Sequence, residues 1–192
     1  MRLACGERTR AESSDQNPGV MTLSGTNCYL VSHGHGPDIT LIDTGSPPPS
    51  APAFIKLLLE YLSTSGSVIR DVILTHHHID HVGGLESVLS SLQTRGAPEP
   101  RIHKFKALMA NSTPASRSVV SDDQLELLVR SLSKNDTGIL WLEHDAKIEM
   151  GTRDSGSSSH LRVLHTPGHT ADSVSIWMED TEELFVGDTI LG

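Results

Sequence analysis

Short apolar runs alternate along the chain with longer segments in which apolar residues recur every three or four positions. The short runs predict strands buried in a sheet, and the longer segments predict helices that pack one face on a sheet. The expected strands are 28–31, 39–42, 68–74, 101–103, 139–142, 146–149, 161–165, 173–178 and 183–187, and the expected helices are 53–62, 84–92 and 122–133. Strands that come first and then alternate with helices indicate an α/β fold, built as a layered α+β sandwich.

The helix expected at 53–62 is the most apolar helix candidate. Its residues Phe54, Leu57, Leu58 and Tyr61 share one face, as in a helix laid on a sheet. Charged residues interrupt the same segment, so we expect no membrane span in this chain.

Two segments are polar. Residues 1–16 predict a disordered tail or a misassigned start, so the folded domain is expected to span 17–192. They contain no apolar stretch typical of a secretory signal, and Glu7 and Glu12 argue against a mitochondrial transit peptide. Residues 151–159 are rich in Gly and Ser and predict a mobile loop.

Composition limits the compartment and the partners. The chain has 192 residues, of which 36% are hydrophobic and 20% charged, which suits one domain with a real core. Cys5 and Cys28 are too few for a disulfide framework, so we expect a reducing compartment, the cytoplasm, with the mitochondrion as the alternative. A net charge of −9 disfavours RNA, which generally binds in a groove lined by Lys and Arg.

The segment Thr-His-His-His-Ile-Asp-His at 75–81 carries the clearest chemistry. It follows the strand expected at 68–74, and therefore lies at a strand end, where α/β proteins place binding residues. Imidazole and carboxylate groups are good zinc ligands, and four of them within six residues can serve two adjacent ions. The four candidate ligands are His76, His78, Asp80 and His81. An inert surface loop or a tag is disfavoured, because a tag is terminal and lacks an embedded Asp.

Two later strand ends add one candidate ligand each. His169 follows the strand expected at 161–165, and Asp188 follows the last expected strand. Each turn alone is weak evidence, because Pro-Gly and Gly-Asp are ordinary turn sequences. Three such strand ends in one chain predict a metal-dependent hydrolase. We interpret the other histidines as a hairpin turn (His33, His35), a side chain directed away from the metals (His77), a supporting residue (His165) and surface residues (His103, His144, His160).

These motifs resemble those of the metallo-β-lactamase superfamily, which has an αββα fold. The resemblance rests on Thr-His-His-His-Ile-Asp-His-Val-Gly-Gly at 75–84, His-Thr-Pro-Gly-His-Thr at 165–170 and Gly-Asp-Thr-Ile-Leu-Gly at 187–192. The sequence at 17–31 narrows it to the lactamase-beta-like protein 2 group, which includes endoribonucleases and thioesterases that release aromatic polyketides from carrier proteins. The resemblance covers 17–192.

The resemblance implies a binuclear site and a role for each ligand. His76, His78 and His169 are expected to bind the first metal, and Asp80 and His81 the second, with Asp188 bridging the two. Two Zn²⁺ ions are expected, although such a site also accepts Fe or Mn. A hydroxide shared by the metals is the expected nucleophile, and Asp80 is the expected catalytic residue that orients it and passes a proton to the leaving group. Asp43 is expected to support the metal loop through hydrogen bonds.

The resemblance leaves the substrate open between two classes. We prefer an acyl thioester or ester, carried by a small molecule or a carrier protein in secondary metabolite biosynthesis, with Met21, Thr26 and Asn27 forming one wall of an acyl pocket. The alternative is an endoribonuclease specific for single strands. The family also supplies a seventh ligand, a His beyond the bridging Asp, whereas this chain ends at Gly192. We therefore expect a domain that is incomplete at its C-terminus, and a third interpretation is an inactive, truncated metal-binding fragment.

Overall fold

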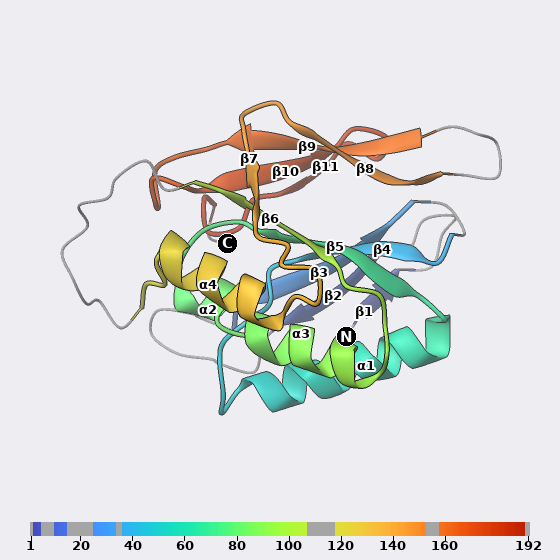
Figure 1. Ribbon diagram of the computed structural model, residues 1–192. Helices are drawn as coiled ribbons and strands as arrows, with labels where there is room; N and C mark the ends of the chain where they lie inside the picture. Colours follow the sequence, from blue (N-terminus) through green and yellow to red (C-terminus); the bar gives the residue numbers. More distant parts are fainter. Residues whose placement is uncertain are drawn as a thin grey trace.

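Two sheets face each other, and helices cover the outer face of the larger one (Figure 1). The computed structural model describes residues 2–4, 10–14, 25–33, 36–106, 118–152 and 158–190. The larger sheet contains, in spatial order, β1 (Arg2–Ala4), β2 (Arg10–Ser14), β3 (Asn27–Ser32), β4 (Asp38–Ile42), β5 (Val68–Leu74), β6 (Arg101–Phe105) and β7 (Leu140–Leu142). The smaller sheet contains β11 (Glu183–Phe185), β10 (Val174–Met178), β9 (Ser158–His165) and β8 (Lys147–Thr152).

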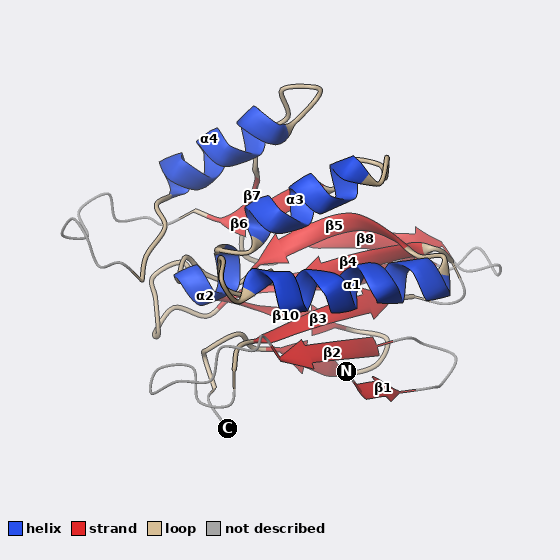
Figure 2. Ribbon diagram, turned by 90° about the horizontal axis from the view of Figure 1, so that it is seen from below, coloured by secondary structure: helices blue, strands red, loops and turns tan. Residues whose placement is uncertain are grey.

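The helices connect the parallel part of the larger sheet. They are α1 (Ala51–Ser65), α2 (Ile79–Val82), α3 (Leu85–Thr94) and α4 (Asp122–Leu132). Strands β4, β5, β6 and β7 pair in parallel, so their carboxyl ends lie at one edge of the sheet. Figure 2 shows α1, α3 and α4 side by side across the outer face of the larger sheet. None of the helices in the described ranges is long and apolar enough to cross a membrane.

The core has two apolar layers, one on each face of the larger sheet. Phe54 and Leu58 of α1 pack with Leu74 in the layer under the helices. Ile73, the neighbour of Leu74 on β5, packs with Leu161 in the layer between the sheets. Successive strand residues point to opposite faces, so a strand segment buried on both faces is apolar at consecutive positions, as Val72, Ile73 and Leu74 of β5 are.

The fold class and the expected elements are confirmed. Strand β5 has the predicted bounds, and α1, α3 and α4 lie within three residues of theirs. Three of the four residues on the face of α1 expected to pack on the sheet, Phe54, Leu58 and Tyr61, are buried, and the fourth, Leu57, is half-buried.

Two expectations about polar segments are corrected. Residues 2–4 and 10–14, placed in the expected disordered tail, form strands, and β2 extends the sheet by pairing with β3. The loop expected at 151–159 is shorter, since β8 continues to Thr152, β9 begins at Ser158, and these two residues pair. Strands pair through backbone groups, so neither case requires apolar side chains. Residues 153–157 lie outside the described residues, and the domain boundary at 17 remains a prediction.

Candidate metal centre

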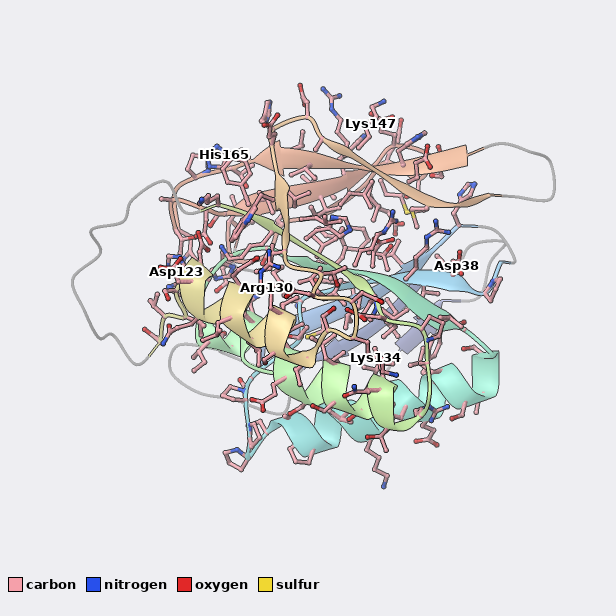
Figure 3. All side chains as sticks on the ribbon, in the orientation of Figure 1. Asp38, Asp123, Arg130, Lys134, Lys147 and His165 are labelled. Atoms are coloured by element: carbon pink, nitrogen blue, oxygen red, sulfur yellow. The ribbon has the colours of Figure 1, made fainter. Side chains whose placement is uncertain are left out.

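Three chain segments meet at the edge where the parallel strands end. The metal loop, which we define as residues 75–81, follows β5, the loop with His169 joins β9 to β10, and Asp188 follows β11. A backbone hydrogen bond from Val174 N to Thr75 O (3.0 Å) ties the smaller sheet to the metal loop. In Figure 3, His165 at the end of β9 lies on the opposite side of the molecule from Asp38, where β4 begins.

The first ligand group consists of His76, His78, His169 and Asp188. His78 Nδ1 lies 3.2 Å from His76 Nε2 and 2.9 Å from His169 Nε2, and His169 Nε2 lies 3.5 Å from Asp188 Oδ2. One ligand atom from each residue lies within 4.8 Å of the others. His76 is buried, whereas the His78, His169 and Asp188 side chains are partly exposed, so the group opens to solvent on one side.

The second ligand group consists of Asp80, His81 and Asp188, and it shares Asp188 with the first. His81 Nε2 lies 3.2 Å from Asp188 Oδ1 and 3.6 Å from Asp80 Oδ2. Asp80 and His81 belong to α2, the single helical turn that begins directly after His78. The structure therefore brings together all six residues that the sequence analysis named as candidate ligands.

Asp43 holds the metal loop from the end of β4. Its carboxylate accepts hydrogen bonds from Thr75 N (2.8 Å), Thr75 Oγ1 (2.8 Å) and His81 Nδ1 (2.7 Å). These are the supporting hydrogen bonds expected of it. Because Nδ1 of His81 donates to Asp43, Nε2 is left as the ligand atom. Asp43 has a φ of 61°, a strained conformation that Asp tolerates better than most residues.

Two glycines allow the segments to approach. A Cβ on Gly84 would collide with the Thr44 carbonyl oxygen, so the start of α3 packs on the segment after β4 only without a side chain. Gly187 has a φ of 51°, and a Cβ there would lie 2.9 Å from Thr75 Oγ1. This turn places Asp188 beside the metal loop.

Comparison with known proteins agrees with this geometry. The model of the metallo-beta-lactamase superfamily matches residues 21–192. The chain belongs to this superfamily. Its relatives include a beta-lactamase-like protein 2 homolog of Caenorhabditis elegans, 31% identical over 176 residues, and the atrochrysone carboxyl ACP thioesterase nsrC of Aspergillus novofumigatus, 32% identical over 179 residues. The expected resemblance to the lactamase-beta-like protein 2 group is confirmed.

The alignments cover 92% of this chain but 48% and 42% of these two relatives, so the chain spans about half the length of the curated relatives it matches. Among solved structures, the B3 metallo-beta-lactamase BLEG-1 aligns with a TM-score of 0.57 and 20% identity, over 95% of this chain and 74% of that protein. That likeness shows the metallo-beta-lactamase fold.

Within this metallo-beta-lactamase domain, the ligand histidines have perturbed pKa values. Burial and the adjacent imidazoles of His81 and His78 lower the pKa of His76 to about 2. Burial also acts to lower the pKa of His81, but the carboxylates of Asp43 and Asp188 outweigh it and raise the pKa to about 10. The His76 imidazole is thus neutral, whereas His81 carries an additional proton, which must leave Nε2 before a cation can bind there.

The donor set fits divalent cations. His81 Nε2 is buried and, within the described part of the chain, has no hydrogen-bond partner, since the nearby Asp188 oxygen lies outside hydrogen-bond geometry. Three ring nitrogens of His76, His78 and His169 converge. Each of the two facing pairs, His76 with His78 and His78 with His169, can share only one proton. Imidazole and carboxylate ligands suit zinc and also accept iron or manganese.

The residues expected at the substrate differ in position. Thr26 is buried, and its hydroxyl donates a 2.7 Å hydrogen bond to Asp80 Oδ2. Asn27 is exposed at the start of β3, and Met21 lies outside the described residues. A substrate role for these three remains a prediction.

The sequence did not reveal that three other polar residues, His103, Lys104 and Asp172, are buried. His103 is not a surface residue, because it is buried on β6 and donates a 2.7 Å hydrogen bond to Asp71. Lys104 and Asp172 are buried as an ion pair that sequence reasoning missed. The available signal was a lysine inside an otherwise apolar strand. The His77 ring contacts Asp172, which agrees with the expectation that His77 is directed away from the metals.

Proposed function

We propose that this protein is a metal-dependent hydrolase of acyl thioesters or related esters, with a binuclear site. In this proposal His76, His78 and His169 hold one ion, Asp80 and His81 hold the second, and Asp188 contacts both. The observation that carries it is that Asp188 belongs to both ligand groups, with one oxygen facing His169 and the other facing His81. Zinc is the favoured metal, with iron or manganese as alternatives.

The chain's own residues have separate tasks in the reaction. When bound, paired divalent ions lower the pKa of a coordinated water and polarise the bond under attack. Asp80 accepts the proton of the attacking water and returns it to the leaving group, as a general base and acid. Thr26 donates to one carboxylate oxygen of Asp80 and fixes its rotamer. Asp43 keeps His81 in the tautomer whose Nε2 faces the site.

The substrate class rests on a relative's name and on charge. The relative nsrC is named as an acyl carrier protein thioesterase. A net charge of −9 disfavours the phosphate backbone of RNA. We therefore favour an acyl group on a small molecule or a carrier protein, in a secondary metabolite pathway, with Met21, Thr26 and Asn27 on one wall of its pocket. The low cysteine content supports a reducing compartment, the cytoplasm or the mitochondrion.

Metal analysis and a substrate panel test the proposal. We expect about two zinc ions per chain, and hydrolysis of acyl-CoA and acyl-carrier thioesters that is lost with His78→Ala. Activity on single-stranded RNA alone, also lost with His78→Ala, would replace the thioesterase by the endoribonuclease. A purified, folded protein that binds no metal would reject both and favour an inactive fragment.

A further inference from the structure

Lys104 is a fully buried lysine on β6, the strand next to β5, and β5 leads into the metal loop. It lies on β6 opposite Leu74, the residue before the metal loop, and its side chain has 0% exposure. Its ammonium lies 2.5 Å from Asp172 Oδ2 and 2.9 Å from Asp122 Oδ1, and it donates to Phe105 O at 3.0 Å. An apolar side chain would fill the same space without desolvating a charge. The three contacts therefore point to a role beyond packing.

The partner Asp172 joins the two halves of the site. It lies three residues after His169 and has 0% side-chain exposure. While one oxygen faces Lys104, the other lies 3.0 Å from Nδ1 of His77. His77 stands between the ligands His76 and His78. The chain of contacts from Lys104 through Asp172 to His77 therefore connects the ligands of the larger sheet with the ligand loop of the smaller sheet.

The ligand groups need such a connection. His76 and His78 extend from the larger sheet, whereas His169 and Asp188 extend from the smaller one. Like Asp43, Asp172 is a buried carboxylate that contacts the metal loop, but its contact is the 3.0 Å approach to His77 and it comes from the opposite sheet. A relative shift of the sheets would separate His169 from His78, which now lie 2.9 Å apart.

We propose that Lys104 and Asp172 are positioning residues of the metal centre, which hold the loops of the two sheets at the spacing that metal binding requires. Lys104 fixes the Asp172 carboxylate, and Asp172 fixes the His77 ring and the backbone between the ligands. The inference rests on the proposed function, because it assumes that the six clustered residues bind metal.

Calorimetric titration of the metal-stripped protein with zinc tests the proposal. Lys104→Met and Asp172→Asn should each weaken zinc binding about 10–100-fold, the range found when supporting residues of metal sites are changed. The double variant should bind zinc about as well as the weaker single variant, because both changes break one connection. Asp71→Asn is the matched control, a buried carboxylate on β5 that contacts β6 but not the metal loop, and it should bind zinc like the parent.

Cobalt and a conservative variant separate positioning from general damage. The visible spectrum of bound Co²⁺ reports ligand geometry, and it should change in Lys104→Met but not in Asp71→Asn. His77→Gln keeps a side-chain N–H for Asp172 and should retain more zinc affinity than His77→Leu. This pair decides the question if circular dichroism shows that Lys104→Met does not fold.

The outcomes distinguish the two proposals. Folded Lys104→Met and Asp172→Asn proteins with parental zinc affinity and cobalt spectra would overturn the positioning role while leaving the proposed function intact. Equal affinities of His77→Gln and His77→Leu would do the same. A parent protein that binds neither zinc nor cobalt would overturn the proposed function, and the positioning role with it.

Discussion

Two clusters of histidine and carboxylate lie along β5, one in mid-strand and one at its carboxyl end. In the mid-strand cluster, Asp71 accepts hydrogen bonds from Arg101 Nε (2.7 Å), Arg101 Nη2 (2.8 Å) and His103 Nε2 (2.7 Å). The buried carboxylate is thus paired with a guanidinium and its oxygens are occupied. This cluster is electrostatically complete within the chain.

The cluster at the strand end is incomplete by the same measure. The imidazoles of His76, His78 and His169 converge, and none of the described lysines or arginines forms an ion pair with Asp80 or Asp188. Its ligand atoms lie within 4.8 Å of one another in each group, and the buried His81 Nε2 has no hydrogen-bond partner among the described residues. The contrast teaches that burial of polar groups does not by itself mark a functional site. A functional site is marked instead by ligand atoms that converge without an ion pair to lysine or arginine.

The largest expected difference between the clusters is in metal binding. Asp188→Ala removes the carboxylate shared by both ligand groups, so bound metal should fall below about two ions per chain. Activity should fall by more than the roughly 100-fold that supporting residues produce. Asp71→Ala should retain the parental metal content. Mass spectrometry of the metals and thioester hydrolysis measure both effects, and equal metal loss in the two variants would contradict the distinction.

Metal removal should destabilise the strand-end cluster while leaving the other unaffected. Dialysis against a chelator should lower the free energy of unfolding by about 2.7 kcal/mol for free metal at 100 times its dissociation constant. Urea unfolding with and without zinc gives this difference. The same difference is expected in Asp71→Asn, since that side chain contacts no candidate ligand. A zinc effect that disappears in Asp71→Asn would show that the clusters are coupled.

The mid-strand cluster should contribute to stability that is lost at acid pH. Burial acts to raise the pKa of Asp71, but the hydrogen bonds from His103 and Arg101 outweigh it and lower the pKa below its usual value. The stabilisation is therefore present above about pH 4, near the unfolded pKa, and is lost as the pH falls through the lowered folded value. Asp71→Asn should cost about 1–3 kcal/mol at neutral pH and should flatten this acid dependence in metal-free urea unfolding. An unchanged acid slope would show that other carboxylates dominate it.

The sequence was most informative where one local pattern decides the outcome. Strand β5 was predicted with its bounds because both ends of its span are apolar, at 68–69 and 72–74, and the six candidate ligands because they follow three largely apolar strands. Strands β1 and β2 were missed because their pairing is a backbone property that polar residues do not reveal. The turn α2 was missed since four residues are too few to show a period.

Partners distant in sequence were the harder part of the site. His103 appeared to be a surface residue because nothing near it in sequence indicates that it faces Asp71, 32 positions away. The pairing of Lys104 with Asp172 joins residues 68 positions apart, one in the larger sheet and the other in a loop of the smaller sheet. Such contacts depend on strand register and on how the sheets pack, and local spacing contains neither.

The smallest expected effect concerns Thr26. Its neutral hydroxyl donates to Asp80 of the strand-end cluster, whereas the charged guanidinium of Arg101 donates to Asp71 of the mid-strand cluster. Thr26→Val removes the 2.7 Å hydrogen bond to Asp80 Oδ2 and keeps the side-chain shape. A neutral hydrogen bond contributes about 0.5–1.5 kcal/mol, so kcat should fall roughly two- to tenfold with little change in KM. Thr26→Ser keeps the hydroxyl and should retain parental kcat. A rise in KM with unchanged kcat would instead place Thr26 against the substrate, the role that the sequence predicted for it, and would leave Asp80 oriented by other groups.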